Sequence, residues 1–112
     1  MLPLKSRVKK VDFPKIMKEG VFLHGNNFYV RYLDRKDSLP PLFSFVVPNK
    51  VKKTSVGRHL IKRRMSAVVE KLLITLKPSI SAIIFAKKDV SSLPFSEIEK
   101  EIVELMKKAR IL

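Results

Sequence analysis

The chain of 112 residues contains no cysteine, which excludes disulfide bonds and thiolate metal sites. It also lacks any run of about 18 apolar residues, so no segment is predicted to span a membrane. Its first residues lack the apolar stretch of about 7–15 residues that a signal peptide carries. These absences favour a cytoplasmic protein with no membrane partner.

Acidic residues are scarce: 10 Asp and Glu face 24 Lys and Arg, which gives a net charge of +14 and a pI near 10.3. No acid occurs between Ser38 and Val69. Such a one-signed field favours a polyanionic partner, above all a nucleic acid. The apolar fraction of 46% is large enough for a real core, so the chain is not a disordered basic tail.

Side chains suited to catalysis are also few. The histidines are His24 and His59, and the acids closest together outside the end of the chain are Asp34 and Asp37, in a predicted loop. None of these has the spacing of a known metal or catalytic cluster. We therefore predict no catalytic residue, no metal ligand and no cofactor in this chain.

Periodicity and turn residues predict three helices and four strands. Asp12 is a candidate N-cap for a short helix that ends at Gly20, and Thr54 or Ser55 can cap a long helix that Pro78 stops. Ser96 and Glu99 have the spacing of a capping box for the last helix. The strands are predicted at residues 21–24, 27–34, 42–47 and 80–87, with a turn at Gly25–Asn26 and the fully apolar last strand in the centre of a sheet.

This order indicates an α+β fold, a single-domain α/β sandwich with the order helix, strands, long helix, strand, helix. Residues 42–87 would form a strand–helix–strand crossover. Residues 1–11 lack helical periodicity and carry Lys5, Arg7, Lys9 and Lys10. We predict that they form a basic N-terminal arm, loosely ordered until it meets a phosphate backbone, and that residues 12–112 form the folded domain.

The long helix divides into two arcs at 100° per residue. The apolar arc holds Ile61, Met65, Val68, Val69, Leu72 and Leu76, and the adjoining arc holds Ser55, Arg58, His59, Lys62, Arg63 and Ser66. The first arc is predicted to pack on the sheet while the second faces solvent. Since like charges on one helix face repel, we interpret the second arc as a phosphate-binding surface.

The stretch VVPNKVKKTSVGRHLIKRR resembles the signature of the bacterial ribonuclease P protein component, an apolar strand, a lysine-bearing turn and a basic helix. Lys50 matches the turn lysine, Arg58 the leading arginine, and Lys62 and Arg63 the lysine–arginine pair. His59 replaces the family's usual asparagine, and Ser66 replaces a further basic residue. Asp12–Phe13 with Gly20, and Ile83–Lys87 with Lys88, resemble the first helix and the apolar strand of that family.

The resemblance implies a ribonuclease P subunit, a domain at residues 12–112 that assists endonucleolytic 5′ maturation of tRNA. The implied partners are a catalytic RNA, which would carry out the reaction with magnesium ions, and precursor tRNA; the protein itself would be monomeric within the ribonucleoprotein. The predicted contacts to the catalytic RNA are Lys50, Lys52, Lys53, Arg58, His59, Lys62, Arg63 and Arg64. A sheet cleft for the single-stranded 5′ leader would use Phe13, Met17, Tyr29, Arg31 and Phe45.

Alternatives remain open from the residues alone. A structural RNA-binding protein of ribosomal type would have the same charge and a similar fold. Helix–turn–helix DNA binding fits poorly, because the long helix follows a strand and not a short helix. For the cleft aromatics the alternative is packing in the core, which we predict outright for Phe28, Phe43 and Phe85.

Overall fold

The structure is a computed structural model that describes residues 2–112, so Met1 of the predicted arm lies outside the described residues. Its regular elements follow the predicted order closely. They are α1 (Phe13–Glu19), β1 (Val21–His24), β2 (Phe28–Asp34), β3 (Leu42–Val46), α2 (Ser55–Leu72), β4 (Ile80–Ala86) and α3 (Phe95–Lys108), with short 3-10 turns at Leu4–Ser6, Lys10–Asp12 and Leu73–Thr75.

The four strands form one sheet in the order β1-β2-β4-β3. β1 and β2 pair antiparallel, as do β2 and β4, whereas β3 and β4 are parallel and are joined through α2. This arrangement confirms the predicted strand–helix–strand crossover. All seven residues of β4 are buried, as expected of a central strand whose residues are apolar on both faces.

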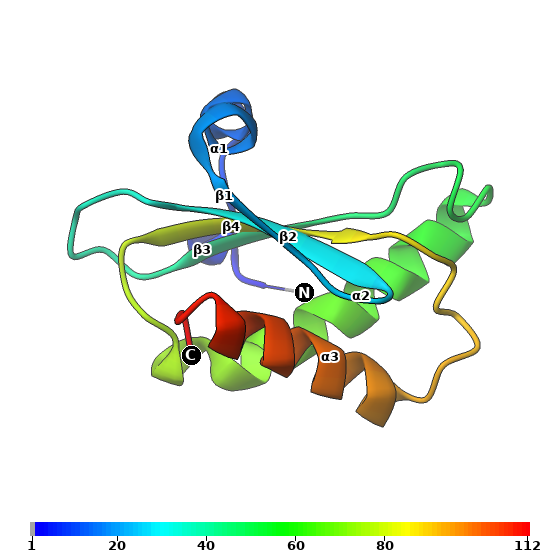
Figure 1. Ribbon diagram of the computed structural model, residues 1–112. Coiled ribbons are helices and arrows are strands. Elements are labelled where there is room, and N and C mark those ends of the chain that lie inside the picture. The colour runs from blue at the N-terminus through cyan, green and yellow to red at the C-terminus, as the bar shows by residue number, and fades with distance from the viewer. Residues whose placement is uncertain (1) are drawn as a thin grey trace.

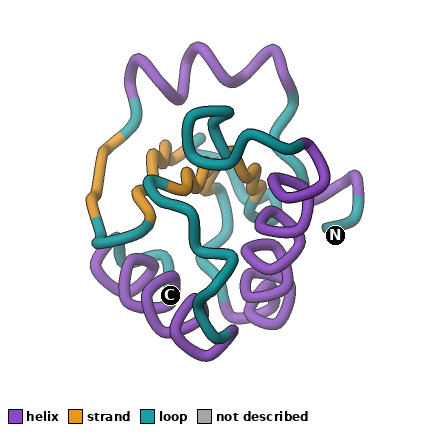
Figure 2. The backbone as a smooth tube through the Cα atoms, turned by 90° about the vertical axis from the view of Figure 1, so that its right-hand side faces the viewer, coloured by secondary structure: helices purple, strands orange, loops and turns teal. Residues whose placement is uncertain are grey.

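The sheet has two unequal covers (Figure 1). Helices α2 and α3 lie side by side against one face, which we call the inner face, and the short helix α1 lies on the opposite, outer face. Figure 2 shows the same layers from the side, with the sheet between α1 and the other two helices. None of the described helices has the length and apolar character needed to cross a bilayer.

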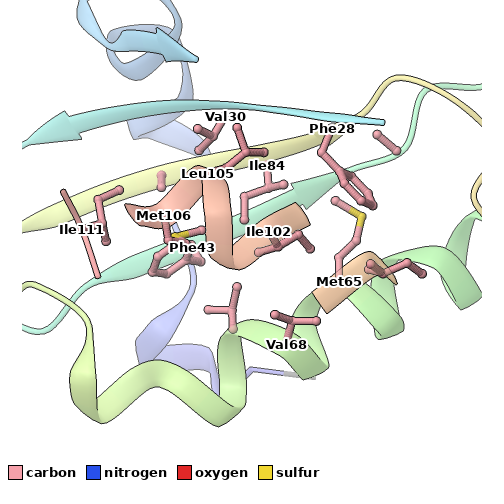
Figure 3. Packing of buried hydrophobic residues seen from close by; sticks show 14 of the residues in the cluster. Phe28, Val30, Phe43, Met65, Val68, Ile84, Ile102, Leu105, Met106 and Ile111 are labelled. Atoms are coloured by element: carbon pink, nitrogen blue, oxygen red, sulfur yellow. The ribbon is translucent and has the colours of Figure 1, made fainter. Parts of the chain in front are cut away.

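The main core fills the space between the inner face and the two long helices (Figure 3). Phe28 and Phe43 are completely buried there, as predicted, and Met65 and Val68 of α2 meet them from the other side. A smaller cluster on the outer face contains Phe85, Ile83, Ile16 and Val8. The apolar arc of α2 therefore packs as the helical periodicity predicts.

The helix ends agree with prediction at the start of α2 and differ elsewhere. Asp12 precedes α1 without forming a side-chain cap, and α2 ends at Leu72, well before Pro78. Thr54 caps α2, since its hydroxyl oxygen accepts a hydrogen bond from the Gly57 amide at 3.1 Å. The predicted capping box of α3 is wrong: the helix begins at Phe95 after Pro94, and no side chain caps it. Ser96 is therefore already helical, and Glu99 instead accepts from Lys71 Nζ of α2 at 2.7 Å.

The turn between β1 and β2 is one residue longer than predicted because α3 holds it. The Glu101 carboxylate accepts hydrogen bonds from the Asn27 amide, the Asn27 side chain and the Phe28 amide, each at 2.8 Å. These donors are thereby turned towards the helix. Nothing local in the sequence signals this contact, because the two partners lie more than 70 residues apart.

The N-terminal segment differs from the loose arm that the sequence predicts. Leu2 is buried in the main core, Val8 is buried in the outer cluster, and Arg7 forms an isolated parallel bridge with Phe43 of β3. The Val8 amide donates to the Phe43 carbonyl at 3.1 Å. The segment is thus anchored along β3, while its bases Lys5, Arg7, Lys9 and Lys10 stay exposed.

Candidate nucleic-acid interface

One side of α2 packs on the core, and the side next to it faces solvent and carries cations. Arg63 and His59 are exposed and Lys62 is half-buried, whereas Ile61 and Met65 of the same helix are completely buried. Within the described part of the chain, the side chains of Lys62, Arg63 and His59 make no hydrogen bond or ion pair. Their charge or hydrogen-bonding capacity therefore remains available for an external partner.

The turn before α2 adds two exposed cations, Lys50 and Lys53, but Arg58 does not extend with them. Its guanidinium folds back and donates to the carbonyls of Lys52 and Lys53 at 2.9 and 2.7 Å. The predicted arc placed Arg58 in solvent with Lys62 and Arg63. In the structure Arg58 closes the turn onto the start of α2, and its predicted contact with RNA stays a prediction.

The loop after β4 contacts two more of the predicted RNA-binding residues. Lys52 Nζ forms an ion pair with Asp89 at 3.0 Å, and Arg64 donates to the Ser91 carbonyl at 3.0 Å. Hydrogen bonds from the Ser91 hydroxyl and amide, followed by the Lys52 ammonium, lower the pKa of Asp89 to about 2. Lys52 is thus the one predicted RNA-contact residue that pairs with a carboxylate among residues 2–112.

Ser66 corrects the predicted arcs. The helical wheel places it with the cations, but its side chain is buried and its hydroxyl donates to the Arg63 carbonyl at 3.0 Å. Ser66 is thus buried beside the basic side of α2 and does not add to its exposed surface.

A cavity of about 260 Å³ lies between α2, β3 and the N-terminal segment. Phe13 and Phe45, two of the predicted leader-cleft residues, line it together with Lys62. The remaining lining comes from Leu2, Arg7, Val8, Lys10, Phe43, Ser44 and Ser66. The cavity therefore combines aromatic walls with several cations, and one of these, Lys62, belongs to the basic side of α2.

The predicted leader-cleft residues do not form a single cleft. Tyr29 and Arg31 project from the outer face, whereas Phe45 packs against the main core on the inner face. Met17 is exposed on α1, and its carbonyl accepts from Arg31 at 2.6 Å. Phe13 lies between the two groups, since it packs on the outer cluster and also lines the cavity. The alternation of side chains along a strand correctly predicts that Tyr29 and Phe28 lie on opposite faces of the sheet. It could not predict which residues of β2 and β3 share a face.

Two residues that sequence reasoning did not select stand beside Tyr29. Phe22 and His24 of β1 pair in register with Arg31 and Tyr29 of β2, so all four share the outer face. The ring centroids of Phe22 and Tyr29 are 4.9 Å apart, and those of His24 and Tyr29 are 5.7 Å apart. The hairpin register, applied to the predicted turn, is the signal that could have found them.

Comparisons with known proteins agree with this geometry. The family model described as Ribonuclease P matches residues 2–110. The Ribonuclease P protein component of Streptococcus pneumoniae is 29% identical over 109 residues, which cover 94% of this chain and 85% of that protein. Among solved structures, the RNase P protein of Staphylococcus aureus has a TM-score of 0.82 at 21% identity, with 95% and 96% of the two chains covered. That of Thermotoga maritima has a TM-score of 0.80 at 20% identity, with 91% and 96% covered.

Proposed function

The chain belongs to the ribonuclease P protein family, and on that premise we propose which of its surfaces hold the catalytic RNA and which hold the substrate. As a family member it partners an RNA subunit in a ribonucleoprotein endoribonuclease that processes tRNA. Membership of this family does not favour the alternative, a structural RNA-binding protein of ribosomal type with no processing role.

The basic side of α2 is the surface that we assign to the catalytic RNA. The observation that carries the proposal is the pair Lys62 and Arg63 on α2, together with the exposed Lys50 and Lys53 in the turn before this helix. No carboxylate pairs with any of these four in residues 2–112. Clustered cations without internal partners gain free energy when they replace the counterions of a phosphate backbone. Because A-form RNA hides its bases in a deep groove, such a helix would bind phosphates and shape.

Bond cleavage belongs, in this proposal, to the RNA subunit and its magnesium ions. The protein contributes binding energy and position: the cations of α2 anchor it to the catalytic RNA, and the aromatic surfaces nearby hold the 5′ leader of precursor tRNA. Unpaired bases stack on aromatic rings whatever their sequence, which suits a leader that differs between tRNAs. Phe13, Phe45 and the cavity cations lie next to α2, and Tyr29 with Arg31 lies farther across the sheet.

Reconstitution tests the function directly. The purified protein is mixed with a ribonuclease P RNA, and precursor tRNA cleavage is measured at low magnesium concentration with and without protein. We expect the protein to raise the cleavage rate, because it replaces part of the charge neutralisation that magnesium otherwise provides. A rate that the protein leaves unchanged would contradict the proposal.

A matched pair of variants locates the surface. Lys62→Ala with Arg63→Ala removes two cations from α2, whereas Lys107→Ala with Lys108→Ala removes two exposed cations from the end of α3. Both variants have the same net charge. Stimulation of cleavage should fall strongly with the first pair and little with the second, and equal losses would mean that only net charge matters.

The leader contact has its own test. Arg31→Ala should weaken binding of precursor tRNA more than binding of mature tRNA, because only the precursor carries a leader. The ratio of the two affinities is the informative quantity, since Arg31 also bonds the Met17 carbonyl and its loss would disturb α1 in both measurements. Equal losses for the two RNAs would rule out the contact.

A further inference from the structure

Helix α2 carries two apolar side chains on the side that faces away from the core. Val56 is 79% exposed and Leu60 is 43% exposed, although the core-facing residues of the same helix are completely buried. At about 100° per residue, Leu60 lies about 40° from Val56 on the helical wheel, and the buried Met65 lies about 180° from it. We call Val56 and Leu60 the outer apolar pair of α2.

The fold itself does not account for this pair. Among the regular elements of residues 2–112, α2 contacts α3, β3 and the 3-10 turn that follows it, and neither Val56 nor Leu60 is among the residues that form the core. The solvent-facing side of an amphipathic helix is normally polar, and valine is a weak helix former. An apolar pair four residues apart stabilises a helix only slightly. The pair is therefore an apolar surface without a partner in the described chain.

Basic side chains flank the outer apolar pair. On the helical wheel Arg63 lies about 20° from Val56, and His59 lies about 60° from it on the same flank. Both are exposed, as is Lys53 in the turn before α2. No carboxylate pairs with Lys53 or Arg63 among residues 2–112. The outer apolar pair is therefore continuous with the basic surface that we assign to the catalytic RNA.

Cations and apolar side chains bind different parts of an RNA. Lysine and arginine contact phosphates, which every RNA carries along its whole length. Valine and leucine gain free energy only where water leaves an apolar surface, and in RNA that surface consists of sugars and bases. Folded RNA exposes these in its wide, shallow minor groove and in loops. An acidic protein would also match the cations, but membership of the ribonuclease P family favours an RNA as the partner.

We propose that Val56 and Leu60 pack on a sugar-and-base surface of the catalytic RNA, beside phosphates bound by cations such as Arg63, and that this contact makes α2 selective for that RNA. The inference rests on the proposed function, because it deepens the contact between α2 and the catalytic RNA. The cations supply affinity that depends on salt and that any RNA can satisfy. The outer apolar pair supplies affinity that does not depend on salt and that only an RNA of fitting shape can satisfy.

The test uses the full chain and a variant whose net charge is unchanged. Val56→Thr with Leu60→Gln makes the outer apolar pair polar and keeps the approximate size of each side chain. The matched control is Ile74→Thr with Leu39→Gln, because these two residues are 99% and 61% exposed and lie outside α2. Lys62→Ala with Arg63→Ala measures the ionic part of the contact in the same assay.

Each protein is titrated with a ribonuclease P RNA, and separately with an unrelated RNA duplex, over a range of salt concentrations. We expect the Val56→Thr, Leu60→Gln variant to bind the ribonuclease P RNA about tenfold more weakly at every salt concentration, as the loss of a small buried apolar contact would do. Its dependence of log affinity on log salt should keep the original slope, and its affinity for the duplex should change little. The Lys62→Ala, Arg63→Ala variant should instead show a flatter slope with both RNAs.

The outcomes separate this inference from the proposed function. If the Lys62→Ala, Arg63→Ala variant binds the ribonuclease P RNA like the original protein, the proposed function fails and this inference fails with it. If that variant loses affinity but the Val56→Thr, Leu60→Gln variant binds like its Ile74→Thr, Leu39→Gln control, the apolar contact alone is overturned. An equal loss for the ribonuclease P RNA and the duplex would also overturn it, as would a lowered melting temperature that accompanies the loss, since the pair would then act by stabilising α2.

Discussion

The inner and outer faces of the sheet carry similar residues, yet they are covered differently. On β2, Phe28 and Val30 point inward and are sealed by α2 and α3, while Tyr29 and Arg31 point outward beside a helix of only seven residues. The two sets alternate along one strand, so their local sequence environment is the same. The long helices α2 and α3 bury Phe28 on the inner face, whereas the short α1 leaves Tyr29 half-buried on the outer face.

This difference assigns separate tasks to the two faces. The inner face is close-packed and should hold most of the stability, because buried aromatic rings lose both transfer free energy and contacts when truncated. The outer face is left partly open, and its Tyr29 is only half-buried. Substitutions on the two faces should therefore separate stability from RNA binding.

Phe43 and Tyr29 provide the largest contrast. Phe43→Ala should lower the free energy of unfolding by about 3–5 kcal/mol, because Phe43 is completely buried in the main core and its removal leaves a cavity. Tyr29→Ala should cost about 1–2 kcal/mol, since its ring is only half-buried. Urea unfolding of both variants measures the difference. Equal losses would show that the outer face is as much a part of the core as the inner one.

RNA binding should rank the same two variants in the opposite order. At a temperature where both are folded, Tyr29→Ala should reduce the preference for precursor over mature tRNA, while Phe43→Ala should leave this preference intact. If Phe43→Ala abolished the preference for precursor tRNA and Tyr29→Ala left it unchanged, the assignment of RNA binding to the outer face would be wrong.

Much of this fold could be predicted because its signals are local. Pro14, Gly20 and Thr54 mark helix ends by their own backbone chemistry, and the apolar run of β4 marks a central strand. What could not be predicted depends on partners far along the chain. Glu101 lengthens the β1–β2 turn, and Leu2 draws the N-terminal segment into the core.

In the candidate site, too, local features could be predicted and contacts with distant residues could not. The basic side of α2 could be read from helical periodicity, and Lys62 and Arg63 do lie free on it. The periodicity could not show that Arg58 folds back onto two carbonyls or that Asp89 reaches Lys52 from the loop after β4. Nor could strand parity alone show that Phe45 and Tyr29 face opposite ways, because that depends on how β3 and β2 align through β4.

An effect of intermediate size is expected among the cations at α2. Lys62 and Arg63 are free of internal hydrogen bonds in residues 2–112, whereas Arg58 is bonded to two backbone carbonyls. Removing Lys62 or Arg63 should flatten the dependence of log affinity for the catalytic RNA on log salt by about 0.7–0.9 for each lost phosphate contact. Removing Arg58 should change that slope less and lower the melting temperature more, because its guanidinium holds the turn before α2. Binding titrations over a range of salt concentrations, with melting curves for each variant, test this ranking.

The ion pair at the edge of the basic surface should give the smallest effect, and its sign can be worked out. The Ser91 hydroxyl and amide, with Lys52, lower the pKa of Asp89 from 3.8 to about 2 in the folded protein. The ionised carboxylate thus stabilises the fold above pH 3.8, and this stabilisation is lost as the pH falls towards 2. Asp89→Asn should therefore lower the melting temperature slightly at neutral pH, and the difference should shrink as the pH falls through this range.

Melting curves of Asp89→Asn and the original protein from neutral pH downwards measure that difference. Glu104→Gln on α3 removes the same charge from an exposed residue and is the matched control. A gap that stays constant at every pH would mean that the asparagine disturbs the loop by its shape, and the ionised state of Asp89 would then have no part in holding Lys52. A gap that closes with acid would identify a carboxylate that restrains one cation of the basic surface while Lys62 and Arg63 stay free for phosphate.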